Sequence, residues 1–484
     1  MGYDLNTIQH IQQFNSDSRV MRLQRLFKNS SILEIVGIER NETRHSKFIR
    51  WVFKMPEINT KSRYSPIMHL LDILVRRDYE QNPNKQIVPT DFGNSIINRN
   101  TSISIIDVQP EYQTEGLKFK NKKGVAKSGL IDIYITALIS SEENQKVLHI
   151  CIENKLYTDE HDSQTTKYYA YMTGGNDLDK DKDKIEFDKG TYKCPTKQGD
   201  IVLFAFLSPT PECIMKDKAV LDKKCECKKY IHINYQDIVN EILTPLVEDE
   251  ATPDSAKKKI DQYISTLSIP GDEALENKNN KDDETLSKTV MASGKEMLIL
   301  ANDIYKDYKK LFIKAVFDSN YSSFKTGYKD FLTNLMTTVS HSTDDDQDFL
   351  YSKLMVLRLN GKKNNYLVMH DETYHVYGQK EFAVNFAKLY CKKMAENSVL
   401  DVKMLNGVFK TVKGPTADAP LFVTPPIYNP KKTNLYDEVY DDGKGLKIYF
   451  ANNIWGTGDY LPKLEDFIKQ HCSKEYIIIQ SPER

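Results

Sequence analysis

The feature that most constrains this chain is an apolar run that ends in three polar residues. Residues 147–153 read VLHICIE, and Glu153, Asn154 and Lys155 close the run. A short apolar run rich in β-branched residues predicts a buried strand. Because side chains alternate between the faces of a strand, Glu153 and Lys155 are expected to point the same way. An unpaired buried ion costs on the order of several kcal/mol, so a compensating partner is expected.

A neighbouring strand supplies a second acid. Residues 130–137, LIDIYITA, predict a strand that follows Gly129 and carries Asp132 near its start. Cross-strand neighbours lie only ~5 Å apart, so Asp132 can lie beside Glu153. Carboxylate oxygens are the ligands that Mg²⁺ prefers, completed by waters and substrate phosphate. The two acids and Lys155 therefore predict metal-assisted phosphodiester cleavage, with Lys155 positioning the attacking water.

These residues carry a resemblance to a known family. Asp132, followed after a gap by Glu153-Asn154-Lys155, resembles the motif of the PD-(D/E)XK nuclease superfamily, although Ile131 stands where the family name has proline. Asn41 is a suitable N-cap for a helix expected to start at Glu42. Glu42 resembles the upstream helical acid that often completes the metal site of that family. The resemblance covers roughly residues 30–245.

The helix expected at 162–172 strengthens the resemblance. Gln164 and Tyr168 are similar to the Gln-X-X-X-Tyr motif of RecB-like members. Residues one helical turn apart share a face, so both can point back toward the strand ends. The resemblance implies that Gln164 and Tyr168 orient water or phosphate.

The resemblance also implies a fold, a cofactor and a substrate. It implies an α/β fold, a restriction-endonuclease-like mixed β-sheet core flanked by helices. It implies Mg²⁺, or Mn²⁺, held by Asp132 and Glu153 with Glu42 assisting. The implied substrate is nucleic acid, DNA in preference to RNA, in a setting of bacterial restriction or phage defence. Two other interpretations stay open: a catalytically inactive nucleic-acid or protein binding module on the same fold, and a nuclease-like scaffold for a working C-terminal half.

The order of expected elements suggests several domains, as a length of 484 residues does. We expect a nuclease domain at 1–267, a polar linker at 268–286, a helical segment at 287–345 and a separate C-terminal α+β domain at 346–484. Short strands are expected within 349–377, among them FLYSKLMVLRL at 349–359. The C-terminal half is expected to recognise substrate, form a homodimer or gate activity.

Charge and composition limit the choice of partner. The formal net charge is −1, so a nucleic acid would have to be met by a local basic patch or by metal ions. The lysine-rich stretch 118–124 is one candidate, and a solvated turn is its alternative. No apolar run is long enough for a membrane span, and no secretory signal pattern opens the chain, so we expect a cytoplasmic protein.

Several residues keep two interpretations. His45 can support the site or pack in the core, and Glu111 and Glu115 can face the metal or the solvent. Four thiols in one loop-rich segment can be free or can bind zinc, although their spacing is irregular; they are Cys194, Cys213, Cys225 and Cys227. No Gly-rich phosphate-binding loop is present, so an ATPase is not expected.

Overall fold

The computed structural model divides the chain into two compact units, which are described separately. One unit comprises Met1–Leu311 and Asn334–Asp345, and the other comprises Phe312–Thr333 and Asp346–Arg484. The residues that the structure describes are 5–28, 41–55, 65–121, 124–126, 129–140, 145–156, 160, 163–175, 185–188, 190–268, 291–360, 365–370, 373–396, 400–408, 421–424, 436–444, 446–451, 460–472 and 476–480. The predicted linker at 268–286 lies outside them, apart from Ser268.

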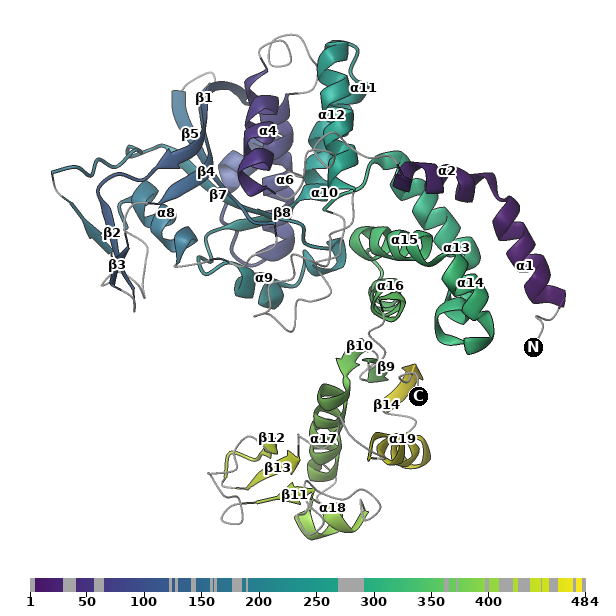
Figure 1. Cartoon of the computed structure of the whole chain (residues 1–484). Helices are drawn as coiled ribbons and strands as arrows, with labels where there is room; N and C mark the ends of the chain where they lie inside the picture. Colours follow the sequence, from purple (N-terminus) through teal and green to yellow (C-terminus); the bar gives the residue numbers. More distant parts are fainter. Residues whose placement is uncertain are drawn as a thin grey trace. The chain divides into compact units, whose positions relative to one another are not determined.

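A mixed five-stranded sheet forms the centre of the first unit (Figure 1). Its strands are β1 (Ser102–Gln113), β4 (Leu130–Ser140), β5 (Gln145–Asn154), β7 (Ile201–Ser208) and β8 (Ile231–Asn234), in the order β1-β4-β5-β7-β8. The first three pair antiparallel, and β5, β7 and β8 pair in parallel. The predicted mixed sheet flanked by helices is confirmed.

Helices cover both faces of this sheet (Figure 1). One face carries α4 (Glu42–Lys54), α6 (Pro66–Gln81) and α12 (Asp254–Leu267), and the other carries α8 (Gln164–Thr173). This unit also contains the helices α1 (Leu5–Ser16), α2 (Ser18–Lys28), α7 (Thr90–Ile97), η2 (Glu212–Ile214), α9 (Lys218–Lys224), α10 (Tyr235–Asp237), η3 (Ile238–Leu243) and α11 (Thr244–Glu248). A small sheet is formed by β2 (Leu117–Asn121), β3 (Gly124–Ala126) and β6 (Ile185–Phe187). Helices α13 (Lys295–Phe317) and α15 (Lys329–Ser342) run from one unit into the other.

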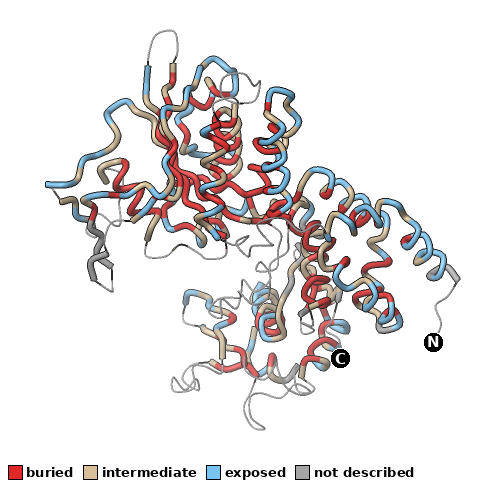
Figure 2. Tube along the Cα trace, turned by 45° about the horizontal axis from the view of Figure 1, so that its top comes forward, coloured by how far each residue is buried: buried red, intermediate tan, exposed pale blue. Residues whose placement is uncertain are grey.

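The side chains of β5 alternate between the two faces of the sheet, and this determines to which face Glu153 points. Ile150 and Ile152 are buried in the core beneath α4 and α6, whereas Cys151 is buried in the core beneath α8. In Figure 2 most of the trace of this sheet has the colour of buried residues. Because alternate residues share a face, Glu153 points to the same side as Cys151, toward α8.

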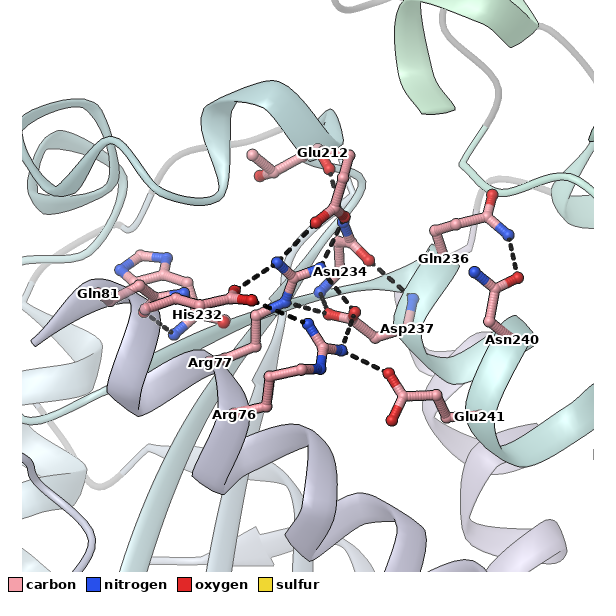
Figure 3. A network of polar contacts seen from close by, with 12 residues as sticks. Arg76, Arg77, Gln81, Glu212, His232, Asn234, Gln236, Asp237, Asn240 and Glu241 are labelled. Atoms are coloured by element: carbon pink, nitrogen blue, oxygen red, sulfur yellow. Dashed lines mark hydrogen bonds and ion pairs between the residues drawn. The ribbon is translucent and has the colours of Figure 1, made fainter. Parts of the chain in front are cut away.

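A network of polar contacts joins α6 to the edge strand β8 and to α10 (Figure 3). The fully buried guanidinium of Arg77 donates to both oxygens of Glu212 at 2.7 and 2.6 Å and to both oxygens of Asp237 at 3.0 and 2.7 Å. Asp237 also closes a capping box with Asn234. Since each charge here is paired with opposite charge, we read the network as a structural clamp and not as a site.

The second unit is an α+β assembly of short elements. It contains α14 (Ser322–Gly327), α16 (Asp346–Leu359), α17 (Gln379–Glu396), α18 (Val402–Val408) and α19 (Tyr460–His471). Two three-stranded sheets have the orders β10-β9-β14 and β11-β13-β12. Their strands are β9 (Asn365–His370), β10 (Thr373–Gly378), β11 (Phe422–Val423), β12 (Tyr436–Asp441), β13 (Lys447–Ala451) and β14 (Tyr476–Gln480).

One predicted strand in this unit was wrong. Residues 349–359 belong to helix α16. A short apolar run is compatible with a buried helix as well as with a strand, and its leucine, methionine, lysine and arginine residues are good helix formers. Across both units, no described helix combines the length and the apolar character that a bilayer crossing requires.

Candidate active site

The ends of β4 and β5 bring two of the predicted acids together. The antiparallel register pairs Ile133 with Ile152, so the next position places Asp132 opposite Glu153. Oδ2 of Asp132 accepts a hydrogen bond from the backbone N–H of Asn154 at 2.7 Å. Burial raises the pKa of Asp132 to about 6, against the opposing effects of this hydrogen bond and of Lys155.

Glu153 is the most deeply buried member of the cluster, with 1% of its surface exposed. Its Oε1 lies 2.8 Å from Nζ of Lys155, whereas its buried Oε2 has no hydrogen-bond partner among the described residues. Burial, followed by the charge of Asp132, raises the pKa of Glu153 to about 8. A carboxylate oxygen left unpaired in the interior is costly, so this atom suits a ligand.

Lys155 continues the line of β5 and is also buried. Its backbone N–H donates to the carbonyl of Leu207 on β7 at 2.9 Å, which fixes the start of its side chain. Burial opposes the charged form, but the carboxylates around it, Glu153 first, outweigh burial and raise the pKa of Lys155. The ammonium therefore stays charged next to the two acids.

Glu42 reaches the same place from the N-terminus of α4. Its Oε1 accepts the backbone N–H of Leu156 at 3.0 Å, and its Oε2 lies 3.9 Å from Nζ of Lys155. The helix begins at Glu42 because the side chain of Asn41 caps it by accepting the N–H of Arg44. The charge of Glu42 also contributes to the raised pKa of Asp132, so three predicted acids surround one lysine.

Asn154 connects the three segments that supply these acids, and the sequence reasoning missed it. Its buried amide donates to Oγ of Ser46 at 3.1 Å and to the carbonyl of Glu42 at 3.3 Å. Its Oδ1 accepts the hydroxyl of Tyr235 at 2.7 Å. The only signal in the sequence was an amide at the variable position between Glu153 and Lys155.

Gln164 and Tyr168 lie on α8, over the face to which Glu153 points. The Tyr168 hydroxyl accepts hydrogen bonds from the side chain of Gln164 and from the backbone of Leu130, at the start of β4. Burial, with the charges of Glu153 and Asp132, raises the pKa of Tyr168. Oε1 of Gln164 is buried and has no partner among the described residues.

Glu111 lies at the same edge of the sheet. Strand β1 pairs Pro110 with Ile133 and Tyr112 with Ile131, so Glu111 lies opposite Asp132. Its φ of 51° is in the left-handed region, which a non-glycine residue adopts rarely and often near functional sites. Its Oε2 lies 3.7 Å from Nζ of Lys47, and its charge adds to the raised pKa of Asp132.

The other residues with two interpretations differ in their surroundings. His45 is buried and shares a hydrogen bond of 2.9 Å with the Tyr263 hydroxyl, and Glu115 is exposed in the turn after β1. Cys194 is exposed, Cys213 is half-buried, and Cys225 and Cys227 are buried. No group of three or more His, Cys, Asp or Glu side chains in the described ranges is arranged to hold a metal ion, so those thiols form no zinc site there.

The pair Asp132 and Glu153 nevertheless fits a hard divalent cation. Mg²⁺ takes one or two protein carboxylates and fills its remaining positions with water and phosphate, so it does not need three protein ligands. The observation in favour of this fit is Oε2 of Glu153, which no group of the described residues pairs.

A comparison with known families gives the same result. Residues 30–265 match the model of the PD-(D/E)XK nuclease superfamily. Over these residues the chain belongs to that superfamily. Its members usually hydrolyse phosphodiester bonds of nucleic acid and generally use divalent metal ions. The C-terminal half matches no family model, and no curated protein and no solved structure matches the chain.

Proposed function

We propose that residues 30–265 form a nuclease that hydrolyses phosphodiester bonds of DNA and depends on Mg²⁺ or Mn²⁺. One observation carries the proposal: within the described residues, Oε2 of the buried Glu153 has no hydrogen-bond partner, while its Oε1 lies 2.8 Å from Nζ of Lys155 and Asp132 lies opposite on β4. Asp132 and Glu153 would hold the ion, and Glu42 would complete the set. Such an ion, when bound, supplies positive charge that favours deprotonation of water and screens the phosphate.

Lys155 positions the attacking water and stabilises charge on the phosphate. In the reaction, the water oxygen bonds to phosphorus while the bond to the leaving oxygen breaks, and negative charge grows on the phosphate oxygens. A preorganised ammonium in a largely buried site stabilises this charge without further rearrangement. The contacts of Nζ with Glu153 at 2.8 Å and with Glu42 at 3.9 Å hold the ammonium in place.

Gln164, Tyr168 and Glu42 support this geometry. Oε1 of Gln164, which has no partner in the described part of the chain, can accept a hydrogen bond from water or from a group on the substrate. Tyr168 holds the start of β4, two positions before Asp132. The Leu156 N–H holds Oε1 of Glu42, and Oε2 of Glu42 lies on the side of Lys155.

Cleavage assays test the proposal directly. Supercoiled plasmid, linear duplex, single-stranded DNA and RNA would be incubated with Mg²⁺ or with EDTA. We expect DNA cleavage that EDTA abolishes and that Lys155→Ala lowers by about 10²–10⁴-fold. Lys146→Ala, at the exposed opposite end of β5, is the matched control and should retain full activity. Activity that survives unchanged in Lys155→Ala removes the assignment.

The same variants separate a nuclease from a binding module. Calorimetry with Mn²⁺ should give a heat of binding that is lost in Asp132→Asn. Metal binding without cleavage of any substrate would favour the binding module. The resemblance alone supports a role in restriction or phage defence, which phage plating tests. A homodimer is a separate expectation for the C-terminal half, and the mass in solution tests it.

A further inference from the structure

The outward face of α4 is a row of cations around one tryptophan. The helix buries five side chains toward the sheet. Arg44, Lys47, Trp51 and Lys54 follow at spacings of three, four and three residues, so they share the opposite face. The three cations are exposed and Trp51 is half-buried. The only acid of α4 is Glu42, in its first turn.

Helix α12 adds a further cation to this row. Phe48 of α4 stacks on Tyr263 of α12 with ring centroids 3.8 Å apart, so the two helices pack side by side (Figure 1). Nζ of Lys259 lies 5.5 Å from the centroid of the Trp51 ring. We call Arg44, Lys47, Trp51, Lys54 and Lys259 the α4 ridge.

The acids beside the ridge neutralise it only in part. Lys47 lies 3.7 Å from Glu111, and Lys54 lies 2.8 Å from Asp107. In both pairs each side chain is about 40% exposed, so the pairs are weak and can be exchanged for phosphate contacts. Within the described residues, no acid pairs with the Arg44 side chain. The ridge is thus a local basic surface on a chain whose formal net charge is only −1.

The ridge starts at the candidate active site. The helix begins at Glu42, whose carboxylate lies 3.9 Å from Lys155. Arg44 follows two residues later, and Lys54, ten positions beyond Arg44, lies about 15 Å further along the helix. A strand whose scissile phosphate lay at Lys155 could therefore continue along these cations.

We propose that the α4 ridge binds the phosphate backbone of the nucleic-acid strand that enters the site. The proposal rests on the proposed nuclease function and assigns the surface that holds its substrate. Lys and Arg bind phosphate oxygens, and the exposed part of the half-buried Trp51 ring can also receive an unpaired base.

Binding measured without turnover tests the proposal. A fluorescein-labelled 30-mer, single-stranded or duplex, would be titrated with the full chain in EDTA at several salt concentrations. Arg44→Glu with Lys47→Glu should weaken binding at least tenfold. For the duplex, it should lower the slope of log K against log salt by about 2, since each lost phosphate contact removes about 0.9. Lys258→Glu, beside Lys259 but without the Trp51 contact, is the matched control and should bind like wild type.

Two further readouts keep the outcome clear. The chain has two tryptophans, so in a Trp455→Phe background the fluorescence of Trp51 should change when the oligonucleotide binds. Circular dichroism verifies that the charge-reversed protein is folded. If the wild type cleaves DNA and the double variant binds and cleaves equally well, the proposed role of the α4 ridge is wrong. The nuclease assignment is not affected by that result. Wild type that neither binds nor cleaves overturns both.

Discussion

The backbone N–H of Asn154 donates to Oδ2 of Asp132 at 2.7 Å, while the Asn154 side chain holds the first turn of α4. Asn154 thus ties β4, which carries Asp132, and α4, which carries Glu42, to the strand that carries Glu153 and leads into Lys155. A metal-assisted reaction requires these groups to be fixed before substrate binds.

The Asn154 amide is therefore predicted to affect metal binding as well as stability. Asn154→Ala removes the acceptor of the buried Tyr235 hydroxyl and the amide that donates to Ser46 and to the Glu42 carbonyl, which should lower the free energy of unfolding by about 1–3 kcal/mol. It should also weaken Mn²⁺ binding in calorimetry, because Glu42 loses its support. Asn406→Ala, which removes two hydrogen bonds to Phe422 in the second unit, should lower stability alone. Unchanged Mn²⁺ affinity in Asn154→Ala would contradict the positioning role.

The raised pKa of Glu153 predicts how stability depends on pH. A buried carboxyl with a pKa near 8 binds a proton more tightly in the folded state than in the unfolded state, where the pKa is about 4.5. Stability of the metal-free protein should therefore fall as pH rises from about 4.5 to about 8, by at most about 1.4 kcal/mol per pH unit for this proton. Asp132, with a pKa of about 6, should add to the fall below pH 6.

Thermal melts in EDTA and in Mg²⁺ measure this effect. Glu153→Gln should flatten the fall in EDTA, because the amide has no proton to lose. In Mg²⁺ the stabilisation should grow with pH, since the ionised carboxylates are the ligands. A wild-type melting temperature in EDTA that rises from pH 5 to pH 8 would argue against the buried acid.

Gly129 is predicted to control where Asp132 lies. A Cβ atom there would be 2.7 Å from the Tyr168 hydroxyl oxygen and 2.6 Å from its Cε1, so Gly129→Ala must displace Tyr168 or the start of β4. We expect a loss of stability of about 1–3 kcal/mol and a fall in kcat with little change in KM. Gly327→Ala, where no atom lies within 4 Å of the added carbon, should have neither effect.

The Arg77 network is predicted to matter for folding and not for the reaction. Arg77→Ala leaves the half-buried Glu212 without its cation and the buried Asp237 with Arg76 alone, and it should cost about 3–5 kcal/mol in urea unfolding. Arg99→Ala removes an exposed pair with Asp72 and should cost less than about 1 kcal/mol. At a temperature where both variants are folded, their kcat should match wild type. A selective loss of kcat in Arg77→Ala would show that the network reaches the site.

Alternation and spacing in the sequence predicted much of this arrangement. The apolar pattern of β4 and β5 placed Asp132 and Glu153 near each other, because cross-strand neighbours follow from register. The role of Asn154 could not be predicted, since its partners Ser46 and Tyr235 lie 108 and 81 residues away along the chain. The helix at 349–359 was missed because a short apolar run has no period that separates a buried helix from a strand.

Crystals soaked in Mn²⁺ test the central claim most directly, through the anomalous signal of the ion. We predict a peak within coordination distance of both a carboxylate oxygen of Asp132 and Oε2 of Glu153, and no peak there in Asp132→Asn. Well-ordered wild-type crystals with Mn²⁺ bound elsewhere, and none between these two acids, would contradict the account.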